Sequence, residues 1–297
     1  MDTTQIRYFI SAVKVGNFTV AAADNNISQS SFSKKIMALE RELGVELFTR
    51  SKRNLALTDA GQFFFKYAKD FELNYYSMRA SLQQFSAAHT GSVRVSSIPV
   101  IHPYHLAPFF SDFKSAYPGI SLDIIELSES TFVYDRLRHG ECDCVIARMD
   151  YLDTDQYDLI PLVQDELVVL VPIGHRLAQY DTVSAAQLRN EKTSFPIKET
   201  DFYNLCEAAC LKGGFTPNPY FTISGQAALI DMMRNDQFIA FGMEKIVTRM
   251  PLEHLKVVHL HEKITSTTAL VRHRKHAMHD NMKQFWSYAQ KYWAETP

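Results

Sequence analysis

Apolar side chains in the first part of the chain recur at the spacing of α-helices. In residues 3–15 they lie at positions i, i+3, i+4 and i+7, counted from Ile6 to Val13, and a second stripe is formed by Phe32, Ile36, Leu39 and Leu43. A short Ala-rich stretch, residues 18–24, lies between the stripes, and glycines at positions 16 and 44 are typical of helix ends. The pattern predicts three consecutive short helices that each bury one face.

A longer helix is predicted for residues 58–88, where the apolar positions alternate steps of four and three. This repeat is typical of a coiled-coil seam, and its members are Phe64, Ala68, Phe71, Tyr75, Met78, Leu82 and Phe85. We expect the seam to pair with a second copy of the chain, because an exposed apolar stripe is unfavourable in water. Packing against the chain's own domain is the alternative.

From residue 91 onwards, short apolar runs alternate with amphipathic stretches. The expected strands are residues 93–97, 120–127, 144–147, 167–172, 220–223, 238–241 and 266–272. The expected helices are residues 103–117, 131–139, 201–212, 226–234 and 277–292. Alternation of strands with helices predicts parallel sheets with crossover helices. The order of the elements predicts two α/β lobes, with the end of the chain returning to the first.

One face at the start of the third short helix is polar. After Ser28, a good N-cap, this face carries Gln29, Ser30, Ser33 and Lys34. Amides, hydroxyls and ammonium groups can hydrogen-bond base edges and phosphates. A basic hairpin follows the helix and contains Arg50, Lys52 and Arg53. This combination predicts a winged helix-turn-helix, and a small helical bundle without a ligand is the alternative.

Residues 9–61 resemble the DNA-binding domain of the LysR-type transcriptional regulators. The matching pattern, read from Ser28, is S/T-Q-x-x-x-S-R-x-I-x-x-L-E-x-x-L-G-x-x-L-F-x-R-x-x-R-x-x-x-L-T-x-A-G. Ser30 stands where the family often has Pro, Lys34 where it usually has Arg, and Asn25 where Leu is common. The resemblance implies DNA contacts by Ser28, Gln29, Ser30, Ser33, Lys34, Arg50 and Arg53.

Residues 91–297 resemble, more loosely, the effector domain of the same regulators, which is similar to a periplasmic binding protein. The run VVLVPIGHRLA at residues 168–178 carries part of this likeness. The resemblance implies an α/β effector domain of two Rossmann-like lobes, preceded by an all-α winged helix-turn-helix and a long linker helix. The expected divisions are a DNA-binding domain at 1–58, a dimerising linker helix at 59–89, and an effector domain at 90–297 with lobe I at 91–160 and 266–297 and lobe II at 161–265.

Two α/β lobes joined by crossing strands leave a cleft at the carboxyl ends of their strands. Four loops should face it, namely residues 96–100, 128–131, 198–202 and 224–226. Their hydroxyls and free backbone N–H groups suit a carboxylate or a similar polar group, although helix capping explains any single hydroxyl. The expected effector-binding residues are Ser97, Pro99, Val100, Ser128, Ser130, Thr131, Thr200, Phe202, Gly225 and Gln226.

The composition is that of an ordinary globular protein, with 46% hydrophobic and 22% charged residues. The net charge is −2, but residues 1–90 hold 11 Lys/Arg against 8 Asp/Glu, so the basic excess accompanies the expected DNA-binding part. No run of about 18 apolar residues predicts a membrane span, and the N-terminus lacks the pattern of a signal peptide. We therefore expect a cytoplasmic protein that does not bind membranes.

Two groups of residues could carry other chemistry. Six histidines lie late in the chain, where we expect solvated side chains rather than a metal site: His254, His259, His261, His273, His276 and His279.

Cys206 and Cys210 lie four residues apart on an expected helix, whose geometry disfavours a disulfide, and redox sensing is the alternative. Four cysteines in 297 residues do not predict a disulfide framework.

No G-x-S-x-G, P-loop or H-E-x-x-H motif occurs, so we expect neither an enzyme nor a cofactor. A solute-binding protein is a third interpretation, which the basic N-terminal part disfavours. The sequence thus predicts a sequence-specific regulator that binds double-stranded promoter DNA as a homodimer or homotetramer. We expect a small-molecule effector between the two lobes to control it.

Overall fold

The computed structural model describes residues 1–49, 55–83, 92–127, 130–150, 152, 155–198, 200–223, 225–234 and 238–295. They fold into two compact units, Met1–Arg79 and Ala80–Pro297. No helix within the described ranges is long and apolar enough to cross a membrane.

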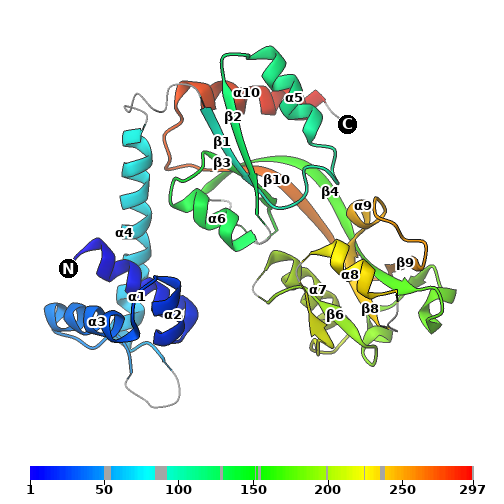
Figure 1. Ribbon diagram of the computed structural model, residues 1–297, viewed down its shortest axis with the longest axis horizontal. Helices are drawn as coiled ribbons and strands as arrows, with labels where there is room; N and C mark the ends of the chain where they lie inside the picture. The colour runs from blue at the N-terminus through cyan, green and yellow to red at the C-terminus, as the bar shows by residue number, and fades with distance from the viewer. Residues whose placement is uncertain are drawn as a thin grey trace. The chain divides into compact units, whose positions relative to one another are not determined.

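The N-terminal unit is helical (Figure 1). Its elements are α1 (Thr3–Val15), α2 (Phe18–Asp24), α3 (Gln29–Leu43) and most of α4 (Asp59–Gln83). The helices that apolar spacing predicts are confirmed, and the last expected residues of the long helix, 84–88, lie outside the described residues. Phe9, Phe32 and Leu39 from the predicted stripes are fully buried in the shared core.

Capping residues set the ends of these helices. Asp2 and Gln5 form a capping box at the start of α1, and Gly16 ends the helix at a φ of 69°, a left-handed conformation that favours glycine. Ser28 is the N-cap of α3, and its hydroxyl accepts a hydrogen bond from the Ser31 N–H at 3.3 Å. The polar residues that follow Ser28 therefore occupy the first turns of α3.

Close contacts fix the base of the wing between α3 and α4. The Glu40 carboxylate of α3 accepts hydrogen bonds from the backbone N–H groups of Leu47 at 2.7 Å and Phe48 at 3.1 Å. A β-bridge between Phe48 and Leu57 closes the base. Gly61 on α4 approaches so closely that an added Cβ would lie 2.0 Å from the Leu47 carbonyl oxygen. The wing therefore starts from a position set by both helices.

The C-terminal unit is built on a ten-stranded sheet that passes through two lobes. Lobe I contains three parallel strands, β1 (Ser92–Ser97), β2 (Ser121–Glu126) and β3 (Cys144–Arg148). Helix α6 covers one face of these strands, and α5 and α10 cover the other (Figure 1). The three helices are α5 (Ala107–Ala116), α6 (Ser130–Arg138) and α10 (Asp280–Glu295).

Lobe II repeats the plan with shorter elements. Its strands are β5 (Thr182–Val183), β6 (Thr193–Phe195), β7 (Phe221–Thr222), β8 (Ile239–Met243) and β9 (Leu255–Leu260). Its α-helices are α7 (Asp201–Lys212), α8 (Gln226–Met232) and α9 (Glu244–Val247). Two 3-10 turns, η2 (Arg176–Gln179) and η3 (Ala185–Leu188), complete it. Strands β5, β6 and β9 were not predicted from the sequence.

Two antiparallel strands, β4 (Tyr157–Pro172) and β10 (Thr265–His273), join the lobes. Strand β4 continues into lobe II, where it pairs with β8 and β9, and β10 pairs with β3 of lobe I. The expectation of parallel sheets therefore holds for β1–β3 and for β6 with β7 and β8, and is wrong at the centre of the fold. There β4 and β10 cross between the lobes in opposite directions.

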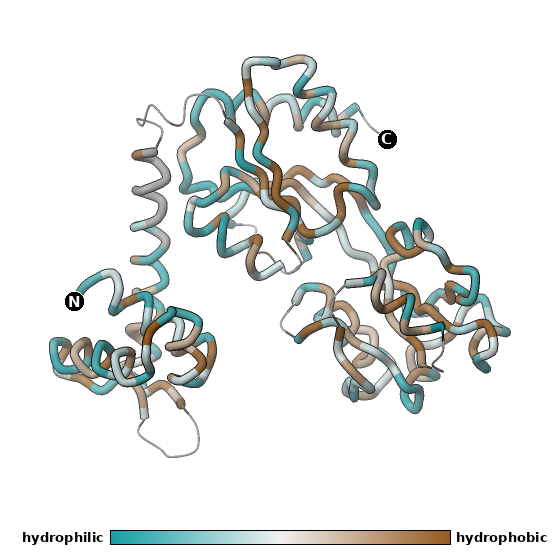
Figure 2. Tube along the Cα trace, viewed as in Figure 1, coloured by the Kyte–Doolittle hydropathy of each residue, from teal (hydrophilic) through white to brown (hydrophobic). Residues whose placement is uncertain are grey.

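Alternating side chains of β4 divide the core of lobe II. Val168 and Leu170 pack with α8 residues such as Ile230, whereas Val169 and Val171 belong to the larger core that includes α7. Helices thus cover both faces of the sheet, as in other buried α/β sheets. Figure 2 shows apolar segments gathered along the strands of both lobes.

Candidate DNA-binding face and ligand cleft

The start of α3 presents the polar residues that the sequence singled out. The exposed side chains there are those of Ser28, Gln29, Ser30 and Lys34, and that of Ser33 is half-buried. The Gln29 amide donates from Nε2 to the Ser33 hydroxyl at 2.9 Å, which holds it on the outer face of the helix. This face can offer hydrogen-bond donors and acceptors to base edges and phosphates.

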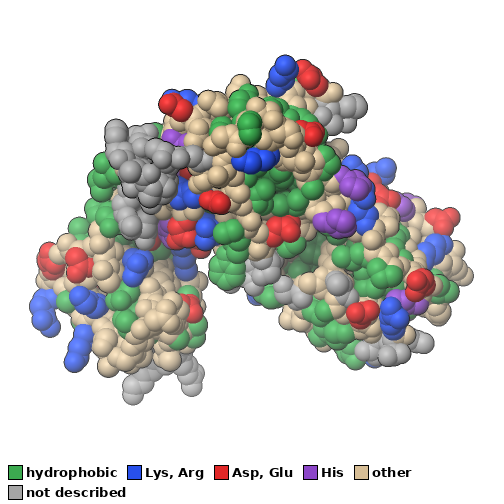
Figure 3. Space-filling view, turned by 45° about the horizontal axis from the view of Figure 1, so that its top comes forward, with side chains coloured by type: hydrophobic (Ala, Val, Ile, Leu, Met, Phe, Trp, Pro, Cys, Tyr) green, Lys and Arg blue, Asp and Glu red, His purple; other side chains and the backbone are tan. Residues whose placement is uncertain are grey.

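Two exposed lysines, Lys34 and Lys35, lie in the first turns of α3. Figure 3 shows Lys and Arg side chains at the outer edge of the N-terminal unit, with Asp and Glu side chains among them. The base of the wing continues for one further backbone hydrogen bond, from the Thr49 N–H to the Ala56 carbonyl at 2.8 Å. Arg50 and Arg53, which were expected to contact DNA from the wing, lie outside the described residues.

A cavity of about 260 Å³ lies between the two lobes of the C-terminal unit. A cavity of about 150 Å³ accepts benzene, so this one has room for roughly ten non-hydrogen atoms. Seven of the ten residues expected at an effector site line it: Pro99, Val100, Ser130, Thr200, Phe202, Gly225 and Gln226. The carboxyl ends of strands in both lobes thus meet at one cavity, as the α/β pattern predicts.

The other three expected residues have different positions. Ser97 is fully buried at the end of β1, and its hydroxyl donates to the Ile98 carbonyl at 2.6 Å. Thr131 is half-buried on α6 and does not line the cavity. Neighbouring residues on a helix point in different directions, which explains why Ser130 reaches the cavity and Thr131 does not. Ser128 lies outside the described residues.

Two charged residues of the cavity, Arg148 and Asp201, were not among the expected effector-binding residues, although Asp201 lies in the loop 198–202 that was expected at the cleft. Arg148 ends β3 and is only 6% exposed. Its Cζ lies 5.6 Å from the centroid of the Phe202 ring, and Nη1 donates to the Ser266 hydroxyl at 3.3 Å. A charged residue at the carboxyl end of an apolar strand was the signal that could have identified it.

Asp201 begins α7 on the lobe II side of the cavity. Its backbone N–H donates to the Ser130 hydroxyl of lobe I at 3.3 Å. Burial raises the pKa of the Asp201 carboxyl, and the Ser130 hydroxyl and the charge of Arg148 oppose that rise. Two contacts, Ser130 with Asp201 and Arg148 with Phe202, therefore join the lobes beside the cavity.

Comparison with known proteins assigns both units of the chain. Residues 3–62 match the bacterial regulatory helix-turn-helix protein, lysR family. Residues 86–294 match the LysR substrate binding domain. The chain belongs to the LysR family of bacterial transcriptional regulators.

Full-length relatives support the same assignment for this LysR-type regulator. It is 25% identical over 256 residues to the HTH-type transcriptional regulator CysL of Bacillus subtilis strain 168, covering 86% of this chain and 85% of CysL. It is 29% identical over 195 residues to the Hca operon transcriptional activator HcaR of Escherichia coli K12, covering 63% of this chain and 62% of HcaR. The crystal structure of HinK, a LysR family regulator from Pseudomonas aeruginosa, shares the fold at a TM-score of 0.57, with 21% identity and 98% of each chain covered.

The family, the fold class and the general function predicted from the sequence are confirmed by these matches. This LysR-type regulator joins a DNA-binding helix-turn-helix to an α/β effector-binding domain. Its relatives are transcriptional regulators, not enzymes.

The expectation of solvated histidines late in the chain is wrong for two of them. His273 and His276 are 1% and 9% exposed, and their rings stack with centroids 4.9 Å apart. Burial is the main reason that the pKa of each imidazole falls to about 4. The local sequence is rich in charged residues, and so it gave no sign that these rings would be buried beside α10.

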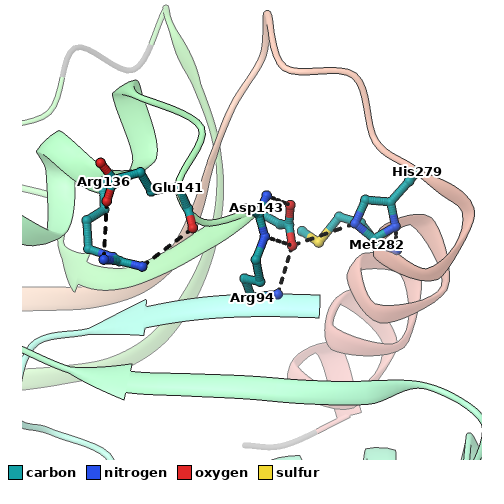
Figure 4. A network of polar contacts seen from close by, with 6 residues as sticks. All are labelled: Arg94, Arg136, Glu141, Asp143, His279 and Met282. Atoms are coloured by element: carbon teal, nitrogen blue, oxygen red, sulfur yellow. Dashed lines mark hydrogen bonds and ion pairs between the residues drawn. The ribbon is translucent and has the colours of Figure 1, made fainter. Parts of the chain in front are cut away.

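A half-buried carboxylate organises the polar contacts near these histidines. Asp143 forms a 2.8 Å ion pair with Arg94, and one of its oxygens lies 3.6 Å from Nε2 of His279 (Figure 4). Burial by itself would raise the pKa of Asp143, but the hydrogen bonds from His279 and Arg94 lower it to about 2. Within the described ranges, no group of three or more His, Cys, Asp or Glu side chains is arranged to hold a metal ion.

Cys206 and Cys210 are buried on α7 and are not joined by a disulfide. Burial raises the pKa of the Cys206 thiol and raises that of Cys210 to about 12. Because the thiolate is the reactive form of cysteine, these thiols lack the character of a redox sensor.

Proposed function

We propose that this regulator binds pseudo-palindromic promoter DNA as a homodimer or homotetramer, and that a small molecule in the cleft changes its affinity for DNA. The observation that carries this proposal is the cavity between the lobes, because residues of both lobes line it. A ligand there contacts Arg148 and Ser130 from one side and Asp201 and Phe202 from the other. It shifts the lobe arrangement by its difference in affinity for the two states.

The DNA contacts in this proposal come from the start of α3 and from the wing. Gln29 reads a base edge, because an amide can form two hydrogen bonds with adenine, and Lys34 contacts a phosphate. Two α3 helices of a dimer enter successive major grooves about 34 Å apart. The full set of proposed DNA-binding residues is Ser28, Gln29, Ser30, Ser33, Lys34, Arg50 and Arg53.

The seam on α4 supports a dimer. Ala68 packs into the core of the N-terminal unit, but further along the helix Phe71, Met78 and Leu82 are 42%, 53% and 58% exposed. A second copy of the helix would cover these side chains. Strand β2 is an edge strand on which Ile125 is 44% exposed, so it offers a second surface for self-association.

The division of the chain belongs to the same proposal. We assign residues 1–58 to the DNA-binding domain, 59–89 to the dimerising linker helix and 90–297 to the effector domain. The protein acts in the cytoplasm in this account, because its target is the chromosome.

DNA titrations with a matched pair of variants test the base-reading part of the proposal. Gln29→Ala removes an amide from the start of α3, and Asn74→Ala removes an exposed amide from α4. We expect Gln29→Ala to weaken binding to the specific site by about 1–3 kcal/mol and to leave binding to random DNA unchanged. Asn74→Ala should change neither. Equal losses on both kinds of DNA for Gln29→Ala would exclude base reading by this residue.

Sedimentation equilibrium tests the dimer. Met78→Glu places a charge on the exposed part of the seam and should shift the protein to monomers. Gln62→Glu places the same charge on α4 outside the seam and should leave the association unchanged. A dimer that survives Met78→Glu with wild-type affinity would contradict the proposed interface.

A further inference from the structure

The cleft holds polar atoms that are buried and have no hydrogen-bond partner. Within the described part of the chain, three such atoms belong to cavity residues: Ser194 Oγ, Asp201 Oδ2 and Gln226 Oε1. The Asp201 carboxyl as a whole is less isolated than the other two groups, because hydrogen bonds with the Ser130 and Tyr134 side chains oppose the rise that burial causes in its pKa. All three can accept a hydrogen bond, and the carboxylate and amide oxygens can do nothing else. All three belong to lobe II, and Ser194 is only 2% exposed. An unpaired buried acceptor is costly, so these atoms favour a ligand that carries N–H donors.

Other hydroxyls of the cavity are already engaged. The Ser130 hydroxyl accepts from the Asp201 N–H at 3.3 Å. The Thr200 hydroxyl donates to the Ile197 carbonyl at 2.8 Å and accepts from the Tyr203 N–H at 3.1 Å. The three unpaired acceptors are therefore a distinct feature of the lobe II wall.

The lobe I wall carries the opposite kind of group. The guanidinium of Arg148 has five N–H donors. One donates to Ser266, and a hydrogen bond between Arg148 and the Tyr104 hydroxyl opposes the rise in the pKa of Tyr104, so donors remain for a ligand. Burial raises the pKa of Asp201 and the charge of Arg148 opposes that rise, yet no ion pair of 4.0 Å or less joins these two described residues. The cavity thus has a cation on one wall and a carboxylate on the other, without direct contact between them.

The remaining wall of the cavity is apolar. It includes Val100 and Pro103 from lobe I and Leu229, Phe241 and Met250 from lobe II. A hydrocarbon group of the ligand would be buried against these side chains, which is favourable in proportion to its area.

We propose that the effector is a small α-amino acid with an apolar side chain. Its carboxylate binds Arg148, and its ammonium donates to the three acceptors of lobe II. This inference rests on the proposed function, because it names the ligand class of the same cleft. The ligand has no net charge, which matches one cation and one carboxylate in the cavity, and its two charged groups contact different lobes.

Two other ligand classes match the cavity less well. A simple carboxylate would leave the acceptors of lobe II unpaired and would bring a second negative charge close to Asp201. A calcium ion takes about six to eight oxygen ligands, whereas the unpaired acceptors number three, of which one is a carboxylate oxygen. Three acceptors correspond to the three N–H donors of an ammonium group.

Calorimetric titration of the full-length protein tests the ligand class. The probes are L-valine, L-leucine, L-isoleucine, L-methionine and L-phenylalanine, and for each one that binds, the amine without its carboxylate and the acid without its amino group. For L-leucine these are 3-methylbutan-1-amine and 4-methylpentanoate. We expect at least one amino acid to bind, and both of its analogues to bind at least about tenfold more weakly, because each lacks one set of charge-assisted hydrogen bonds.

Two variants assign the ends of the ligand. Asp201→Asn should weaken binding of the amino acid, whereas it should strengthen or leave unchanged the binding of the acid that lacks the amino group, because that acid no longer meets a second negative charge. Arg148→Gln should weaken binding of the amino acid and have little effect on the amine. Asp231→Asn, which changes an exposed carboxylate on α8, is the matched control. The titrations of the analogues use the wild-type protein, so they test the ligand class even if a variant fails to fold.

The outcomes separate this inference from the proposed function. If an acid analogue binds as tightly as its amino acid, or if no amino acid of the panel binds, the inference is overturned. The proposed function stands in either case if another ligand of the cleft changes DNA binding. If an amino acid binds as expected but leaves DNA affinity unchanged, the ligand class is correct and the proposed control of DNA binding is wrong.

Discussion

The hydroxyl of Tyr104 donates a 2.8 Å hydrogen bond to Oδ2 of Asp165, a buried residue on the crossing strand β4. The other oxygen of this carboxylate accepts from the backbone N–H of Lys245 in lobe II at 3.0 Å. Pro103, beside Tyr104, and Ile246, beside Lys245, both line the cavity. One buried carboxylate therefore contacts both walls of the cleft, so a ligand that moves either wall also affects the strand that joins the lobes.

Removing the hydroxyl of Tyr104 should destabilise the C-terminal unit. Tyr104→Phe leaves a buried carboxylate oxygen without its donor, which costs about 1–3 kcal/mol. Urea unfolding of the variant measures the loss. The control is Tyr180→Phe, because Tyr180 is 43% exposed and its hydroxyl can be replaced by water. If both variants have the same free energy of unfolding, the Tyr104–Asp165 hydrogen bond does not stabilise the C-terminal unit.

The sequence predicts those parts of the fold that a short-range pattern of apolar residues defines. The stripe of Phe32, Ile36 and Leu39 defines α3, and each of these residues is buried. The loops around Pro99 and Gly225 were placed at the cleft because strand and helix alternate before and after them. Such patterns depend on neighbours within one or two helical turns, and local sequence therefore carries them.

The sequence does not predict contacts between distant segments. The middle of β4 contains Gln164, Asp165 and Glu166, and this polar stretch interrupts the apolar run by which the whole strand could be recognised. The Tyr104–Asp165 hydrogen bond spans 61 residues of sequence. The contact between Arg148 and Phe202 also joins the two lobes, so the sequence did not predict it. Tertiary packing decides such positions, and local propensity does not.

A methyl group at position 61 should disturb the base of the wing. The Cβ of Gly61→Ala would lie 2.0 Å from the Leu47 carbonyl oxygen, so the backbone must shift. We expect a loss of about 1–3 kcal/mol in the stability of the N-terminal unit, as for other overpacked sites, together with weaker DNA binding. Gly119→Ala is the control, because nothing lies within 4 Å of its added Cβ. If both variants unfold at the same urea concentration, α4 and the wing base are not in close contact.

Stability should decrease between pH 6.5 and pH 4. The pKa of His273 and His276 is about 4 in the folded protein against 6.5 for an ordinary imidazole, so the unfolded chain binds more protons within this window. Their contribution is fully present above pH 6.5 and is lost as the pH falls, by at most about 3 kcal/mol for each ring.

Urea titrations at a series of pH values measure this loss. Replacing both rings, as His273→Gln with His276→Gln, should flatten the pH dependence, whereas replacement of the exposed His261 by Gln should preserve it. An unchanged slope in the double variant would mean that other groups control acid unfolding.

The thiols should resist modification in the folded protein. Cys206 and Cys210 are buried, and burial raises their pKa, so little thiolate forms at pH 7.5. We expect a colorimetric thiol reagent to react slowly with the native protein and with all four cysteines after unfolding in urea. Rapid reaction of Cys206 or Cys210, or a disulfide after mild peroxide treatment, would instead support redox sensing.

Residues at the start of α3 should make this protein a sequence-specific DNA-binding regulator. The most direct test selects fragments of the host genome on the immobilised protein and then titrates binding of the most enriched fragment at several salt concentrations. Its scrambled sequence is the control. We expect the selected fragment to bind about 10³-fold or more tightly than the scrambled one, and both affinities to fall steeply as the salt concentration rises. Equal affinity for the two sequences at every salt concentration would contradict this expectation.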